Sequence, residues 1–176
     1  DIYGPSQSMM LGAEIKGSLE VVDELLLPVK LYGIETMSIS FVSSDRTPAI
    51  WRGPMASGAM EQLLTKTKWG QLDVLLVDMP PGTGDIQLTL AQKVRVSGAI
   101  IVTTPQNVAL LDARKGIEMF RRVSIPVIGI VENMSIYVCP ECGHEDRVYG
   151  EGGGNSASKE YDTLLLGEIP LNSKIR

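Results

Sequence analysis

The chain has 176 residues, of which 44% are hydrophobic and 21% are charged, a composition that excludes wholesale disorder. Its 16 Lys and Arg residues are outnumbered by 21 Asp and Glu residues. The resulting net charge of -5 argues against nucleic-acid binding through bulk charge. No run of about 18 apolar residues occurs, so we expect no membrane insertion.

Short apolar runs alternate with stretches of helical spacing along the chain. Continuous apolar runs, as at 74–77 and 99–103, are typical of strands buried on both faces. The alternation predicts an α/β fold with a mostly parallel sheet flanked by helices. In chain order we expect a strand at 37–42, a helix at 57–67, a strand at 74–77, a helix at 86–93, a strand at 99–103, a helix at 108–122, a strand at 127–131, a hairpin or knuckle at 137–149, a flexible loop at 150–154, a helix at 155–162 and a strand at 164–169.

Functional residues are expected just after the strands, because ligands of such sheets bind beyond the carboxyl ends of the strands. Asp78 follows four apolar residues, which is the Walker B pattern of a carboxylate that holds Mg²⁺. The pattern alone also fits a strand terminator or a helix N-cap. Two prolines followed by Gly-Thr-Gly-Asp make it more specific, since such a loop can sense a γ-phosphate through a backbone N–H.

Two further polar residues are candidates by position. Asp1 opens the chain in Asp-Ile-Tyr-Gly-Pro-Ser, and a second carboxylate near a phosphate site could orient an attacking water. Its alternative interpretation is a solvated acid. Asn133 follows the strand at 127–131, and its amide could pair with an adenine edge because it offers both a donor and an acceptor. A surface turn is the alternative there.

The two cysteines form a C-x-x-C pair, Cys139 and Cys142, which can grip one metal centre with two thiolates. A single pair is half of a four-ligand site. His144 could add a third ligand, but a lone histidine beside such a turn is more often solvated. The remaining alternatives are a site shared across a symmetric dimer, a redox dithiol and two incidental thiols. The position after a late strand favours the shared metal site.

Taken together, seven segments resemble one family over the whole chain. The family is the Mrp/ApbC type of iron–sulfur cluster carrier ATPase, within the MinD/ParA-like deviant P-loop group, with Ind1/NUBPL-like proteins as its mitochondrial members. The most specific parts are DMPPGTGD and the stretch from ENMS to the C-x-x-C. The matching segments are DIYGPS at 1–6, WRGPM at 51–55, DVLLVDMPPGTGD at 73–85, TTPQN at 103–107, ENMS at 132–135, the C-x-x-C at 139–142 and LGEIPLNSKIR at 166–176.

The resemblance implies a homodimer that carries a [4Fe–4S] cluster between its subunits. Cys139 and Cys142 of each subunit would be the cluster ligands. The expected function is to bind such clusters and transfer them to apo target proteins, with cluster assembly scaffolds as further partners. The resemblance fits the bacterial cytoplasm, or alternatively the mitochondrial matrix.

The resemblance also implies ATP and Mg²⁺ as cofactors of the complete protein. Asp78 would be the Walker B carboxylate, and Gly82 would belong to the loop that senses the γ-phosphate. Asp1 would position the hydrolytic water or support Mg²⁺. Asn133 and the backbone around Pro170 would contact adenine.

The chain departs from the family pattern above all in its P-loop, because no G-x-x-x-x-G-K-[ST] loop occurs in it. We therefore expect a single partial P-loop NTPase-like domain over 1–176, with a C-x-x-C metal-binding insertion at about 137–149. The N-terminal βα unit and the C-terminal helix of the family would be absent. The complete protein would be an ATPase, whereas this chain alone should bind ATP poorly and hardly hydrolyse it.

Two other functions remain as alternatives. The cysteines could hold zinc in a non-catalytic interaction module, with Asp78 as a relic. The second alternative function is that of a MinD/ParA-like positioning ATPase. The acidic balance of the chain argues against DNA as its target, and no basic amphipathic tail is present for a membrane surface.

Overall fold

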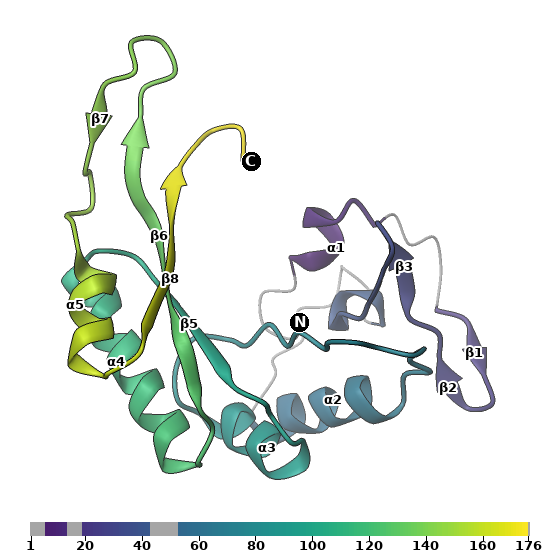
Figure 1. Ribbon diagram of the computed structural model, residues 1–176. Coiled ribbons are helices and arrows are strands. Elements are labelled where there is room, and N and C mark those ends of the chain that lie inside the picture. The colour runs from purple at the N-terminus through teal and green to yellow at the C-terminus, as the bar shows by residue number, and fades with distance from the viewer. Residues whose placement is uncertain (1–5, 14–18, 43–52, 176) are drawn as a thin grey trace. The chain divides into compact units, whose positions relative to one another are not determined.

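The computed structural model describes residues 6–13, 19–42 and 53–175. The chain divides into two compact units, unit 1 at Asp1–Val94 and unit 2 at Arg95–Arg176, and each is described by itself. Both helices and strands occur in each unit (Figure 1). The predicted α/β class is confirmed.

Unit 1 combines short antiparallel hairpins with helices. Strand β1 pairs with β2 and strand β3 with β4. The sequence analysis assigned no elements before residue 37, so α1 and the two hairpins were not predicted. The elements are α1 (Gln7–Met10), β1 (Val21–Val22), β2 (Leu25–Leu26), β3 (Val29–Leu31), β4 (Ile34–Thr36), the 3₁₀ helix η1 (Ile39–Phe41), α2 (Gly53–Thr65) and α3 (Asp85–Lys93).

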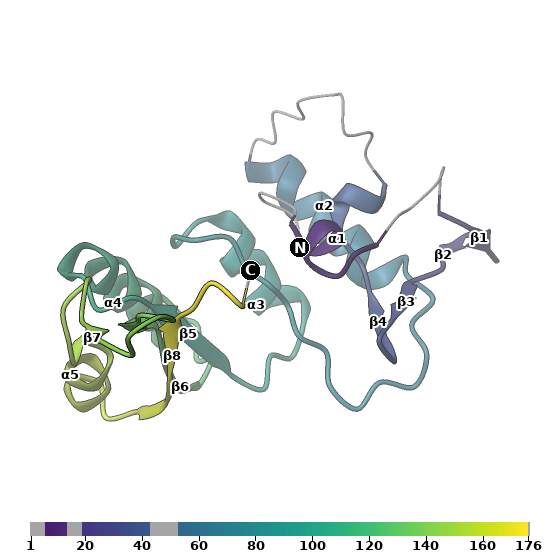
Figure 2. The same ribbon diagram turned by 90° about the horizontal axis from the view of Figure 1, so that it is seen from above.

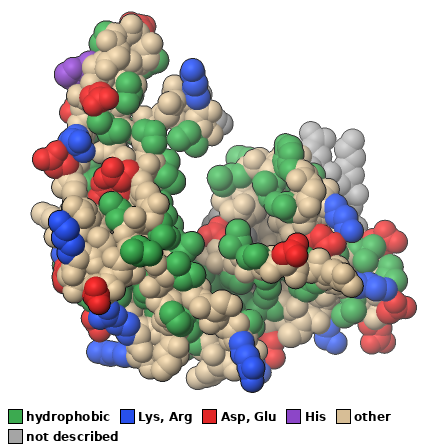
Figure 3. All heavy atoms as spheres, in the orientation of Figure 1, with side chains coloured by type: hydrophobic (Ala, Val, Ile, Leu, Met, Phe, Trp, Pro, Cys, Tyr) green, Lys and Arg blue, Asp and Glu red, His purple; other side chains and the backbone are tan. Residues whose placement is uncertain are grey.

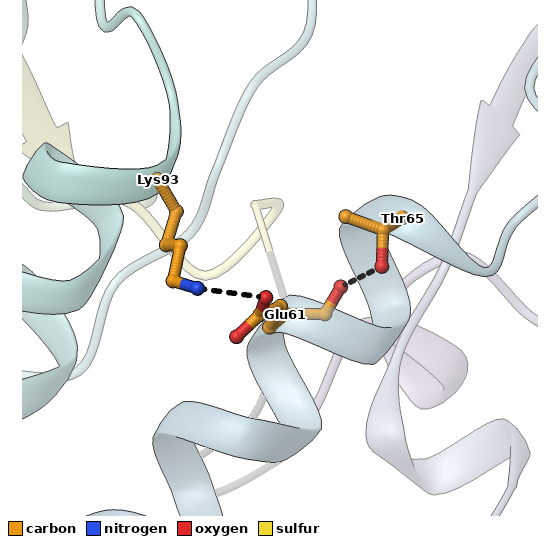
Figure 4. A network of polar contacts seen from close by, with 3 residues as sticks. All are labelled: Glu61, Thr65 and Lys93. Atoms are coloured by element: carbon orange, nitrogen blue, oxygen red, sulfur yellow. Dashed lines mark hydrogen bonds and ion pairs between the residues drawn. The ribbon is translucent and has the colours of Figure 1, made fainter.

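Helices α2 and α3 confirm the helices predicted at 57–67 and 86–93 and pack against each other. At the surface, Lys93 Nζ lies 3.0 Å from Glu61 Oε1, and Thr65 Oγ1 donates to the Glu61 carbonyl oxygen at 2.7 Å (Figure 4). An exposed ion pair of this kind contributes at most about 1 kcal/mol, so burial holds the pair of helices together. Their buried apolar side chains are Ala56, Ala59, Met60, Leu63, Ile86 and Leu90.

The strand predicted at 37–42 is wrong. Strand β4 ends at Thr36, and η1 follows it. The Oγ of Ser38 accepts the backbone N–H of Ser40 at 3.3 Å, a local bond that caps the 3₁₀ turn. The apolar residues that suggested a strand, such as Phe41 at 4% exposure, are buried from this turn instead.

The buried strand predicted at 74–77 is also wrong. This segment has no regular structure, and no strand pairs with it among the described residues. Val74 is 72% exposed and Leu76 is 85% exposed. A continuous apolar run is buried on both faces only where neighbouring strands and two helical layers cover it.

Unit 2 is built on a sheet in which β6 lies between β5 and β8, and both pairings are parallel. The short strand β7 pairs antiparallel with the far end of β6. Helices α4 and α5 lie on the same side of the sheet (Figures 1 and 2). The predicted parallel sheet is confirmed. The elements are β5 (Ala99–Thr103), α4 (Asn107–Arg122), β6 (Val127–Val138), β7 (Glu145–Asp146), α5 (Gly153–Glu160) and β8 (Leu164–Leu171).

The core of unit 2 lies between the sheet and the two helices. One stripe of α4 faces it, as the spacing of apolar residues predicts. The buried residues of this core are Ile101, Leu110, Ala113, Ile117, Ile130 and Ala157.

The opposite face of this sheet is open. Alternate residues of β5 are exposed, with Ile100 at 50% and Val102 at 63%, and Leu164 of β8 is 65% exposed. Hydrophobic side chains show at the surface over β8 in Figure 3. Among the described residues of unit 2, helices pack on one side of the sheet only, so within this unit 99–103 is buried on one face and not on both as expected.

Helix α4, with 16 residues, is the longest helix in the described ranges. None of the helices there is both long enough and apolar enough to cross a lipid bilayer.

Candidate functional site

The two cysteines lie in the turn of the hairpin formed by the end of β6 and β7, which extends beyond the parallel sheet of unit 2 (Figure 1). The backbone N–H of Cys139 donates to the His144 carbonyl oxygen, and that of Gly143 donates to the Cys139 carbonyl oxygen, both at 2.9 Å. Gly143 has a φ of 71°, which glycine adopts without a Cβ clash. Cys139 is half-buried and Cys142 exposed, so the turn presents both thiols near the surface.

The turn also sets the chemistry of one thiol. Hydrogen bonding from the backbone of Cys142, then from the backbone of Glu141 and the side chain of Cys142, holds the pKa of Cys139 below its ordinary value of 9.0. A lower pKa increases the fraction of thiolate, which is the form of cysteine that binds metal and acts as a nucleophile. The backbone of the turn therefore favours the form of Cys139 that can bind a metal.

The described part of unit 2 supplies only a pair of ligands. Among the residues that the structure describes, no group of three or more His, Cys, Asp or Glu side chains gathers as a metal site. His144 therefore does not complete a set with Cys139 and Cys142. A four-ligand iron or zinc site built on these thiols needs ligands from a second molecule or from outside the described residues.

Asn133 and Pro170, both predicted for the adenine side, lie on neighbouring strands of unit 2. Asn133 of β6 is opposite Ile169 of β8, the residue before Pro170. The Asn133 Oδ1 accepts the backbone N–H of Met134 at 3.0 Å, and Ser135 Oγ donates to the Ile169 carbonyl oxygen at 3.3 Å. The Ser135 bond thus joins the two strands at this end, whereas the Asn133 bond holds only its own side chain against β6.

Asp78, the predicted Walker B carboxylate, lies exposed in unit 1, directly after the irregular segment 74–77. Its Oδ2 accepts a hydrogen bond from Nε2 of Gln7 at 2.9 Å. Gln7 belongs to α1, which follows the Asp-Ile-Tyr-Gly-Pro-Ser motif. Sequence reasoning did not identify this partner, because no local pattern joins residues so far apart in the chain.

The loop after Asp78 is held by one buried side chain of α3. Gln87, at 4% exposure, donates from Nε2 to the carbonyl oxygens of Pro80 at 3.0 Å and Gly82 at 3.1 Å. Gly82 has a φ of 103°, a conformation that L side chains rarely adopt. The loop that the resemblance assigns to phosphate sensing therefore has a fixed backbone shape. Gln87 was missed in the sequence, where it looks like an ordinary helix residue.

A cavity of about 380 Å³ lies in unit 1 beside Asp78. Its lining is mostly apolar and comes largely from β4, α2 and segment 74–77. The polar members include Gln7, Glu35, Thr36 and Asp78. Such a lining suits apolar groups better than phosphate.

Asp1 lies outside the described residues. Asp78 and Gly82 belong to unit 1, whereas Asn133, Pro170 and the cysteine pair belong to unit 2. The structure thus places the predicted residues as local groups within each unit.

Comparison with known proteins gives a family match over the whole chain. The ParA family model described as NUBPL iron-transfer P-loop NTPase matches residues 1–176. A solved structure titled as a nucleotide-binding protein in complex with ADP, from Archaeoglobus fulgidus, superposes with a TM-score of 0.80 at 38% identity. That match covers 98% of this chain and 67% of the other.

Several curated relatives are similar over the full length of the chain. The iron-sulfur cluster carrier protein of Pseudomonas fragi is 54% identical and that of Escherichia coli K12 is 51% identical, and each match covers 100% of this chain. The iron-sulfur cluster transfer protein NUBPL of Mus musculus is 46% identical, with the same coverage of this chain. The chain spans 62%, 48% and 55% of these three relatives, respectively, so it matches roughly half of their length.

Proposed function

The chain belongs to the family of NUBPL iron-transfer P-loop NTPases, and on that premise we propose that it binds iron–sulfur clusters and delivers them to apo target proteins. The observation that carries the proposal is the cysteine turn. Cys139 and Cys142 lie together at an exposed hairpin end, and the backbone there favours the thiolate of Cys139. Relatives of this chain from bacteria and mouse are named as cluster carrier or transfer proteins.

We propose that the cargo is a [4Fe–4S] cluster shared by a homodimer. Such a cluster takes four thiolate ligands, and each chain supplies two. Two hairpins related by a symmetry axis would complete the set, with segment 137–149 as the metal-binding insertion of each chain. The location of both thiols in a turn beyond the sheet supports the proposal, since it leaves them accessible to a second subunit and to an acceptor protein.

In the complete protein, we propose that transfer is coupled to the binding and hydrolysis of ATP with Mg²⁺. The metal ion would neutralise charge on the phosphates. Asp78 would hold it, with Gln7 orienting the carboxylate, and the Gly82 loop would face the γ-phosphate. Asn133 and the backbone at Pro170 would contact adenine, and Asp1 would position the water. The ADP named for the similar solved structure supports a nucleotide site in this fold.

The partners in this proposal are apo client proteins and cluster assembly scaffolds. Accessible free thiols are typical of a reducing compartment, for which we propose the bacterial cytoplasm, with the mitochondrial matrix as the alternative. The bacterial and mouse relatives are compatible with both.

Cluster transfer tests the proposed function directly. The chain is reconstituted anaerobically with iron and sulfide and mixed with an apo acceptor whose activity requires a cluster. We expect acceptor activation by the unmodified chain and by Glu141→Gln, a change in the same turn that leaves both thiols in place. The double variant Cys139→Ser, Cys142→Ser should activate nothing. Equal activation by the double variant would refute the proposal, and stoichiometric zinc without sulfide would support a structural zinc module instead.

The nucleotide coupling needs a polypeptide that contains a P-loop. The chain can replace the 176-residue segment that it matches in the Escherichia coli relative. In that chimera, Asp78→Asn should lower ATP hydrolysis by at least about tenfold, because a metal-binding carboxylate is lost. It should also remove the difference between transfer rates with and without ATP. Hydrolysis at the unmodified rate would exclude Asp78 from the nucleotide site.

A further inference from the structure

Glu132 of β6 is a buried carboxylate that the proposed function leaves unused. It is 0% exposed, although glutamates are almost never fully buried unless they are paired. Its Oε2 accepts the backbone N–H of Gly154 at the start of α5, and its Oε1 has no hydrogen-bond partner among the described residues. A carboxylate in this state costs more to bury than an apolar side chain of the same size. Stability alone therefore does not explain the choice of glutamate here.

The backbone that Glu132 contacts is pressed against two other segments. Gly152 precedes α5 with a φ of 66°. A Cβ on Gly153 would lie 2.8 Å from the Pro105 carbonyl oxygen and 2.7 Å from a Leu110 methyl carbon. A Cβ on Gly154 would lie 3.0 Å from Glu132 Cβ. The glycine run therefore lets the start of α5 approach both β6 and the loop between β5 and α4.

The hydrogen bond between Glu132 and Gly154 joins the two ends of the cysteine hairpin, which is the end of β6, the turn with both cysteines and β7. Glu132 lies in β6 upstream of the turn that holds the cysteines, and Gly154 lies where the chain returns from that turn to the body of unit 2. Asn133, the residue proposed to contact adenine, follows Glu132 directly in the chain. One side chain thus connects the strand that leads to the cysteines with the segment that returns from them.

We infer that Glu132 is a positioning residue whose carboxylate fastens the returning segment at Gly154 onto β6, so that the cysteine hairpin and the strand end at Asn133 move as one body. The inference deepens the proposed function and rests on it for the role of the cysteines. The fastening itself is a local property that can be measured without a cluster.

Hydrogen exchange and cluster loss, measured on the whole chain, test this inference. Glu132→Met fills the same space without an acceptor, Glu132→Asp keeps the carboxyl group but shortens its reach, and Glu132→Gln keeps both the reach and an acceptor. Glu168→Gln is the matched control, because Glu168 is exposed and lies opposite Glu132 in the neighbouring strand β8.

We expect the amides of 147–157 to exchange at least about tenfold faster in the Met and Asp variants, because the acceptor for Gly154 is lost or out of reach. Loss of a reconstituted cluster to a chelator should accelerate in the same variants. The Gln variant and the Glu168→Gln control should stay within about threefold of the unmodified chain, and the unfolding midpoint of the Met variant should not fall.

Unchanged exchange of 147–157 in both the Met and Asp variants would overturn the inference. Faster exchange spread evenly over β5, β6 and α4 would also overturn it, since that result indicates a general loss of stability. If the unmodified chain takes up no iron and sulfide, the proposed function fails, while the exchange data still decide whether Glu132 fastens the hairpin.

Discussion

Gln7 and Asp78 are joined by a 2.9 Å hydrogen bond across 71 positions of the sequence. The bond connects α1 to the end of the irregular segment 74–77. Asp78 is therefore oriented by a glutamine side chain, whereas the sequence pattern predicts a carboxylate at the end of a paired strand. Within unit 1, the contact places α1 beside the segment that the resemblance assigns to phosphate chemistry.

The first prediction concerns the stability of Asp78 variants. Asp78→Asn keeps an oxygen that can accept from Gln7 Nε2, and the site is exposed. We expect the free energy of unfolding to change by less than about 0.5 kcal/mol, as measured by urea denaturation. A loss above about 2 kcal/mol would show that Asp78 supports the fold, and a loss of ATP hydrolysis in this variant would then have no mechanistic meaning.

The second prediction concerns the glycines of unit 2. Gly153→Ala should lower the free energy of unfolding by about 1–3 kcal/mol, because the new methyl group meets the backbone of Pro105 and the side chain of Leu110. Gly167→Ala in β8 is the control, since no atom lies within 4 Å of its added Cβ. The urea denaturation midpoints of the two variants, each compared with that of the unmodified chain, test this prediction. Equal effects would contradict the close approach at the start of α5.

The third prediction concerns the one-sided sheet of unit 2. Ile117 is 0% exposed in the core under α4, whereas Val102 is 63% exposed on the opposite face. Ile117→Ala should cost about 2–5 kcal/mol, and Val102→Ala less than about 1 kcal/mol. Urea unfolding of both variants tests this. A large loss for Val102→Ala would mean that the open face is covered in solution.

The fourth prediction concerns pH and Glu35 of unit 1. The backbone N–H of Gly70 donates to Glu35 Oε2 at 2.8 Å, and Lys30 Nζ lies 3.1 Å from Oε1. These contacts, that of Gly70 first, hold the pKa of Glu35 below its ordinary value of 4.5. A carboxyl with a lowered pKa in the folded state stabilises the fold above its unfolded-state value, and this contribution is lost as the pH falls through the folded-state value.

Glu35→Gln should therefore unfold at a lower urea concentration than the unmodified chain at pH 7. The gap between the two midpoints should shrink as the pH falls below 4.5. Urea titrations of both proteins at a series of pH values measure it. A gap that widens toward acid would contradict the sign of the shift.

The sequence predicted the helices better than the strands of this fold. The apolar stripe of α4 is a local pattern, and the alternation of elements predicted a mostly parallel sheet, as β5, β6 and β8 form. The prediction of a buried strand at 74–77 was wrong, because the burial of an apolar run depends on neighbouring strands, and no local pattern reveals whether they are present. The run at 99–103 formed a strand, but the described helices of unit 2 cover only one of its faces.

The missed hairpins of unit 1 differ in the signals that they offered. The turn between β1 and β2 places Asp23 and Glu24 at φ of 54° and 63°, an unusual pair for such a turn. The turn between β3 and β4 contains Tyr32 and Gly33, and the glycine was a usable signal. Gln7 and Glu132 could not be found from sequence, because their roles depend on contacts with residues distant in the chain.

The central claim is that Cys139 and Cys142 together ligate an iron–sulfur cluster, and the iron and acid-labile sulfide content after anaerobic reconstitution tests it most directly. We predict about two iron atoms and two sulfides per chain, which is half of a [4Fe–4S] cluster shared by two chains. His144→Ala should retain this content, whereas the double variant Cys139→Ser, Cys142→Ser should lose nearly all of it. Iron and sulfide bound equally by the double variant would contradict the claim.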